Sequence, residues 1–195
     1  MKTTIFNTPI LSTFLHYFTK IVLYLVGWKV EGQLPDLPKF VLIGAPHTSN
    51  WDFAMFLAVV FILRANVHFM GKAELFRGPL GGFLYWCGGI PVDRTKSQGL
   101  VEQMVQTYRE SDRFILMITP EGTRYKVREW KGGFYHIAKN AGIPVVLAIL
   151  DGTRKAVKVG QVVNLTEDME GDMKTIKEFF TNMVGINPKL TSELS

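Results

Sequence analysis

The chain has little cysteine and no obvious repetition. Cys87 is the single cysteine among 195 residues, so an intrachain disulfide and a cysteine-based metal cage are both excluded. Cys87 itself is either a small buried apolar residue or a reactive thiol. No internal repeat or low-complexity tract is present. With 47% hydrophobic and 20% charged residues, the composition argues against disorder and favours one domain with a single core.

The chain also lacks a large excess of charge. Its net charge is +5 and its pI is near 9.3, which suits an anionic partner such as a phosphorylated metabolite, an anionic membrane or nucleic acid. The Lys and Arg residues are spread out among acidic residues, and no nucleic-acid-binding motif appears. We therefore expect no nucleic-acid partner.

The apolar N-terminus contains neither a signal-peptide cleavage pattern nor an uninterrupted membrane span. Five polar residues interrupt it and form one stripe at helical spacing: Ser12, Thr13, His16, Thr19 and Lys20. Thr8 or Pro9 can begin this helix, and Gly27 can end it. The wide apolar face can lie in a membrane interface or pack over the core of the domain. We expect residues 1–31 to form an amphipathic membrane-associating helix and residues 32–195 to form the main domain.

Apolar strands and helices alternate along the rest of the chain. We predict strands or extended segments at 40–43, 67–70, 89–92, 113–118, 143–150 and 157–163. We predict helices at 51–64, 75–86, 99–110, 134–140 and 169–183. This order indicates an α/β fold with a mixed, largely parallel sheet flanked by helices.

Three loops with unusual chemistry follow predicted strands. They span residues 47–52, 91–94 and 119–124. Ligands of open α/β sheets gather where strands end and helices begin, so the three loops are expected to share one site.

The first loop places His47 five residues before Asp52. A turn after the strand can fold the two together, so that Asp52 holds one imidazole tautomer and His47 acts as a general base on a hydroxyl. Asp52 can instead serve the first turn of the following helix, although Ser49 or Asn50 competes for the cap.

The other two loops bring arginines. Arg94 ends the second loop, and Arg124 follows Gly122 and Thr123 in the third. Gly122 permits close approach of the backbone to a ligand, and arginine offers paired donors to phosphate. Two arginines near a histidine base would suit a phosphorylated alcohol.

These residues resemble the glycerophospholipid acyltransferases, whose best-known members acylate lysophosphatidic acid. His47 to Asp52 is similar to the His-x4-Asp block of that family. The segments at 89–94, 119–124 and 143–146 resemble its second, third and fourth blocks in order and spacing, and the likeness runs from about residue 39 to residue 150.

The resemblance implies transfer of a fatty acyl group from acyl-CoA or acyl carrier protein to the hydroxyl of a lysophospholipid, within a catalytic domain at 32–195. His47 would be the base and Asp52 its partner. Arg94 and Arg124 would bind the phosphate of the acceptor, with Lys72 and Lys131 as further candidates. The remaining expected acceptor-binding residues are Glu121, Gly122 and Thr123.

Glu121 would hold an acceptor hydroxyl or position an arginine, and backbone N–H groups near Gly122 are candidates for the oxyanion. Neither a metal nor a cofactor is expected. The apolar run at 53–63 and the aromatic stretch at 75–86 can each belong to the core or to an acyl groove, and the second can also enter the membrane.

The expected location is the cytoplasmic face of a membrane, with lysolipid and thioester as partners. The alternatives are acyl transfer to a non-glycerol lipid, a thioesterase that uses His47 on water, and a lipid-binding relative without activity.

Overall fold

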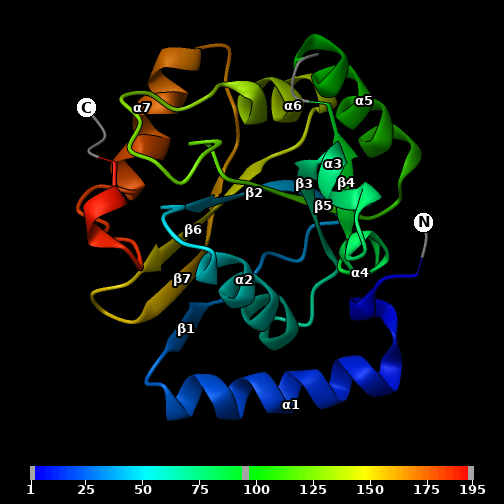
Figure 1. Ribbon diagram of the computed structural model, residues 1–195. Helices are drawn as coiled ribbons and strands as arrows, with labels where there is room; N and C mark the ends of the chain where they lie inside the picture. Colours follow the sequence, from blue (N-terminus) through cyan, green and yellow to red (C-terminus); the bar gives the residue numbers. More distant parts are fainter. Residues whose placement is uncertain (1–2, 94–96, 193–195) are drawn as a thin grey trace.

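The computed structural model describes residues 3–93 and 97–192, and within them seven strands form one sheet in the order β1-β7-β6-β2-β5-β3-β4 (Figure 1). The strands are β1 (Lys29–Gly32), β2 (Lys39–Ala45), β3 (Val67–Lys72), β4 (Gly89–Val92), β5 (Phe114–Ile118), β6 (Val145–Asp151) and β7 (Ala156–Val163). Five neighbouring strands, from β6 to β4, run parallel. The predicted α/β fold with a largely parallel sheet is confirmed.

The remaining two strands extend one edge of the sheet. β7 pairs antiparallel with β6, and β1 pairs parallel with β7. The sequence analysis did not predict β1, because its four residues include Lys29 and Glu31 and form no apolar run. Its extended conformation comes from pairing with β7, and the domain boundary proposed at residue 31 falls within it.

The helices follow the predicted pattern with one exception. They are α1 (Pro9–Leu25), α2 (Trp51–Ile62), α3 (Ala73–Arg77), α4 (Gly81–Trp86), α5 (Ser97–Glu110), α6 (Gly133–Ala141) and α7 (Met169–Phe179), with 3-10 turns at Ile5–Asn7 and Pro188–Leu190. The single helix expected at 75–86 is two short helices. Gly78 is extended because the residue before a proline, here Pro79, is disfavoured in helical conformation.

Helices cover both faces of the sheet (Figure 1). On one face, α5, α6 and α7 bury Met104, Phe134 and Ile176 against the strands. On the other face, α2 buries Phe56 and Val60. Helix α1 lies outside α2, farther from the sheet (Figure 1).

Helix α1 packs Leu11, Leu15 and Leu23 on the domain, and part of its polar stripe faces the domain beside them. Ser12, His16 and Thr19 are half-buried, and the His16 Nδ1–H donates to the Phe61 carbonyl oxygen at 3.0 Å. Thr13 and Lys20, the other members of the predicted polar stripe, are exposed. The outward face is apolar, with these exposed residues: Ile10, Phe14, Tyr17, Phe18, Ile21, Tyr24 and Leu25. Across the described part of the chain, none of the helices has the length and hydropathy to cross a bilayer.

Candidate functional site

The site begins at the end of the central strand. β2 lies between β5 and β6, and its residues from Phe40 to Ile43 are buried on both faces. Two clusters of apolar contacts, one on each face of the sheet, therefore fix the position at which this strand stops. The chain leaves β2 at Ala45, passes through Pro46, and presents His47 at the carboxyl edge of the sheet.

His47 and Asp52 face each other across the turn that follows. The Nδ1 of His47 lies 2.9 Å from Oδ2 of Asp52. Because a carboxylate only accepts hydrogen bonds, Nδ1 carries the proton in this pair, and Nε2 of a neutral ring is left with a free lone pair. The side chain of His47 remains 28% exposed, whereas that of Asp52 is 9% exposed. The ring is thus fixed by its hydrogen bond at Nδ1 and remains partly exposed, as a general base requires.

The same carboxylate oxygen shapes the loop. The backbone N–H groups of Thr48 and Ser49 donate to Asp52 Oδ2 at 2.7 and 2.8 Å. Asn50, at the N-cap of α2, makes no side-chain cap bond, while Ser49 Oγ accepts from the Trp51 N–H at 3.1 Å. Asp52 therefore serves the turn and the imidazole together, so the two roles weighed for it are compatible.

Glu121 supports the loop from the neighbouring strand end. It follows β5, is 2% exposed, and its Oε2 accepts a hydrogen bond from the backbone N–H of His47 at 2.9 Å. Burial raises the pKa of Glu121 to about 7, against the opposing effects of the His47 N–H and the His47 ring. Through this hydrogen bond, the buried carboxyl group of Glu121 joins the end of β5 to the backbone of the candidate base.

A cavity of about 650 Å³ opens beside His47. This volume lies within the range of about 300–1,000 Å³ that is usual for small-molecule sites. Most of the lining is apolar, and α2 contributes Phe53, Phe56, Val59, Val60 and Leu63. The run at 53–63 therefore packs in the core and lines the cavity.

The three predicted loops meet at this cavity. His47 after β2, Val92 at the end of β4, and Thr119 and Gly122 after β5 all contribute to its lining. Parallel strands end at the same edge of the sheet, which is why segments far apart in sequence come together here.

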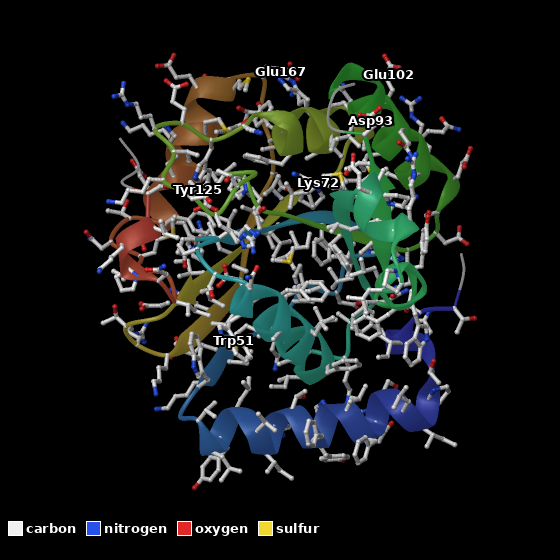
Figure 2. All side chains as sticks on the ribbon, in the orientation of Figure 1. Trp51, Lys72, Asp93, Glu102, Tyr125 and Glu167 are labelled. Atoms are coloured by element: carbon white, nitrogen blue, oxygen red, sulfur yellow. The ribbon has the colours of Figure 1, made fainter. Side chains whose placement is uncertain are left out.

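The expected phosphate ligands are distributed unevenly. Lys131 lines the cavity, and its side chain lies over Gly122, where an added Cβ would meet Lys131 Nζ at 3.1 Å. Arg124 and Lys72 are exposed and are not part of the lining (Lys72 is labelled in Figure 2). Thr123 is half-buried, and Arg94 lies outside the described residues.

Gly122 has the backbone conformation that its position needs. Its φ is +64°, in the left-handed region that favours glycine. Its N–H donates to the Thr119 carbonyl at 3.1 Å and so closes the turn that carries Glu121. The expected oxyanion role therefore does not fit the N–H of Gly122 itself.

One lining residue is not among the expected site residues, and one of the alternatives left open for the aromatic stretch at 75–86 is excluded. His136 of α6 lines the cavity. The sequence does not mark His136 as a site residue, because it has no carboxylate at the spacing of His47 and Asp52. The aromatic stretch around α3 and α4 does not line the cavity. Leu75, Leu80 and Phe83 are exposed instead. Over residues 3–93 and 97–192, no group of three or more His, Cys, Asp or Glu side chains is placed to hold a metal ion.

Comparison with known proteins adds independent findings. Residues 29–150 match the model of the acyltransferase family. A 1-acyl-sn-glycerol-3-phosphate acyltransferase from Haemophilus influenzae is 29% identical over 148 residues, which is 70% of this chain and 60% of that protein. One of the same name from Escherichia coli is 29% identical over 168 residues, covering 81% of this chain and 66% of that protein. The chain thus spans less than two thirds of the length of these relatives.

The fold has a counterpart among solved structures. The crystal structure of the 1-acyl-sn-glycerophosphate acyltransferase PlsC from Thermotoga maritima superposes with a TM-score of 0.60 at 20% identity. The match covers 87% of this chain and 76% of that chain, so the likeness extends over most of the α/β architecture.

Proposed function

Because the chain belongs to the acyltransferase family, we propose that it moves a fatty acyl group from acyl-CoA or acyl carrier protein to a lysophospholipid hydroxyl. An acceptor such as 1-acyl-glycerol-3-phosphate fits the names of its relatives, and the product would enter phospholipid biosynthesis. The observation that carries the proposal is the His47–Asp52 pair, which opens onto an apolar cavity.

In the proposed reaction, Nε2 of His47 takes the proton of the acceptor hydroxyl while its oxygen attacks the thioester carbonyl. Asp52 holds the ring through Nδ1 and stabilises the imidazolium. The tetrahedral intermediate then collapses and expels the thiolate, which receives the proton from His47. The acceptor is the nucleophile, so the step needs no serine, metal or cofactor.

The cavity supplies a place for a hydrocarbon chain. Its walls at Phe56, Val59 and Val60 are apolar and start immediately beside the candidate base. Burial of apolar chain in such a space is favourable by about 0.8 kcal/mol for each CH₂ group. We propose that an acyl chain lies between α2 and the sheet with its reactive end at His47.

Lys131 is the cation best placed to receive a phosphate. Its ammonium group lies beside Gly122 at the cavity, and among the described lining residues only Asp52 is acidic. A lysine offers phosphate a point charge with three donors. Arg124 is close to Lys131 in the sequence and is exposed, and it would assist from outside the cavity.

We propose that α1 seats the protein on a membrane. Its outward face is apolar, it contains no acidic residue, and Glu102 and Glu167 lie at the end of the molecule opposite α1 (Figure 2). A helix of this kind binds at the level of the lipid headgroups. The cytoplasmic face is the location that fits thioester donors carried by coenzyme A or acyl carrier protein.

The proposed activity is tested with purified protein in lipid vesicles. A panel of lysophospholipids is supplied with acyl-CoA or acyl carrier protein donors, and products are read by mass spectrometry. We expect an acylated lysophospholipid with little free fatty acid. Free fatty acid alone would indicate a thioesterase, and no product with any pair would contradict the proposal.

The phosphate assignment is tested by Lys131→Ala. Loss of a charge-assisted hydrogen bond worth about 1.5–3 kcal/mol should raise the KM for a phosphorylated acceptor about 10–100-fold. The effect of Arg124→Ala on this KM should be smaller, because Arg124 does not line the cavity. An unchanged KM in Lys131→Ala, together with a raised KM in Arg124→Ala, would transfer the role to the arginine.

A further inference from the structure

The last described residues return to the loop that carries the candidate base. After α7, residues 184–192 run beside the loop at 46–52. The backbone N–H of Asn187 donates to Thr48 Oγ1 at 3.0 Å, although the two residues are 139 positions apart. Thr48 is 2% exposed and Asn187 is half-buried, so the accepting hydroxyl is buried and the donor partly so.

The packing at this contact leaves no spare room. A Cβ built on Gly185 would lie 2.5 Å from Thr48 Oγ1, 2.6 Å from Thr48 Cγ2 and 3.0 Å from Pro46 Cγ. Any side chain at Gly185 would therefore displace either the C-terminal segment or the loop of His47. Gly185 does not have a positive φ, so the position needs glycine for contact and not for backbone conformation.

The same segment also holds two other loops. Val184 O accepts from the Gly152 N–H at 2.7 Å, in the turn between β6 and β7. Ser192, which is 6% exposed, accepts through Oγ from the Val127 N–H at 3.0 Å. Val127 lies three residues after Arg124, on the loop that follows the predicted phosphate-binding residues.

From these contacts we infer that residues 184–192 form a strap that positions the catalytic loop through Thr48. The inference rests on the proposed function, and the strap lies beyond the family match at 29–150. A continuous set of hydrogen bonds joins the strap to the base. Asn187 N–H donates to Thr48 Oγ1, Thr48 N–H donates to Asp52 Oδ2, and Asp52 Oδ2 holds His47 Nδ1. Thr48 is thus a positioning residue that acts through Asp52.

The first test is Gly185→Ala, because Gly185 does not belong to the proposed catalytic machinery. A displacement of about 1 Å in a reacting group can cost about 100-fold in rate, so we expect kcat to fall about 10–100-fold with little change in either KM. Gly99→Ala is the matched control, since a Cβ there meets nothing within 4 Å, and its kcat should equal that of the parent.

The second test changes the other partner. Thr48→Val keeps the shape and removes the acceptor oxygen, whereas Thr48→Ser keeps the oxygen. We expect the kcat loss in Thr48→Val and recovery in Thr48→Ser. Thr166→Val, which removes a hydroxyl bonded to Asp172 near α7, controls for a general loss of stability.

Hydrogen exchange provides a readout that does not depend on activity. In Gly185→Ala, amide exchange should accelerate in the peptide covering residues 46–52 and stay unchanged in β3. A parent that transfers no acyl group while this exchange pattern holds would contradict the proposed function alone. Parent-like kcat and parent-like exchange at 46–52 in Gly185→Ala and Thr48→Val would overturn the strap.

Discussion

Helices α1 and α7 each bury an apolar residue against the domain, Leu23 and Ile176, yet they expose different kinds of surface. α7 buries Ile176 completely and leaves Lys174 and Glu178 in water. α1 keeps His16 and Thr19 half-buried and exposes Ile10 at 88% and Leu25 at 75%. The α7 arrangement suits a helix between a core and water. The α1 arrangement suits a helix between a protein and an apolar medium.

Two buried carboxyl groups, Asp172 and Glu121, differ in how many hydrogen bonds they accept. Asp172 of α7 accepts hydrogen bonds from Thr166 N–H, Thr166 Oγ1 and Tyr135 Oη. Glu121, at the candidate site, accepts from the His47 N–H, and burial raises its pKa to about 7. The carboxyl in the structural part of the molecule is well solvated by protein. The carboxyl at the site is held at a cost in stability, as is common where function fixes a group.

The largest effect on stability is expected from Ile176→Ala. Ile176 is fully buried against the sheet, so its truncation should lower the free energy of unfolding by about 2–5 kcal/mol. Binding to lipid vesicles should be unchanged below the melting temperature, because α7 is remote from α1. Thermal unfolding and vesicle flotation measure the two quantities. A loss of vesicle binding by the folded variant would break the contrast between the helices.

Glu121→Gln tests the cost of burying a carboxyl at the site. The pKa of Glu121 is about 7 in the folded chain and 4.5 ordinarily, so the folded state binds the proton more tightly. Stability of the parent should therefore fall as pH rises from about 4.5 to 7, by up to about 3 kcal/mol, and level off above that.

Glutamine keeps an acceptor for the His47 N–H and does not titrate. Its variant should show a flatter dependence over this pH window, as measured by urea unfolding at a series of pH values. Parallel curves for parent and variant would show that Glu121 is not the titrating group.

The outward face of α1 is tested by a triple variant, Ile10→Ser, Phe14→Ser and Ile21→Ser. These side chains contact little of the domain, so stability should change by less than about 0.5 kcal/mol. Partition onto vesicles should weaken by about 100-fold, because three apolar side chains no longer enter the interface.

A matched pair on α7, Lys174→Ser and Glu178→Ser, should bind vesicles like the parent. If the triple variant and the parent float equally with vesicles, α1 does not make the membrane contact.

The strands and the His47–Asp52 pair could be predicted because their signals are local. Buried strands appear as apolar runs, and a five-residue spacing across a turn is visible in sequence. β1 could not be predicted in this way, since its pairing with β7 supplies the order. Neither could the contact of Glu121 with the His47 backbone, because a backbone N–H carries no sequence signature.

The choice between Lys131 and Arg124 also depended on tertiary structure. Arg124 ends the third loop and Lys131 follows it, and arginine is the stronger phosphate ligand by chemistry alone. Both side chains are exposed, but Lys131 lies over Gly122 and lines the cavity, whereas Arg124 does not line it. The positioning role of Thr48 could not be predicted from the sequence, because its partner Asn187 lies 139 residues away.

The central claim is that His47 removes a proton from the acceptor hydroxyl. It is tested most directly by comparing acyl transfer rates of purified parent and His47→Ala, with equal melting temperatures as the control for folding. The account predicts a fall in kcat of about 10²–10⁴-fold. Equal transfer rates in the two proteins would contradict it.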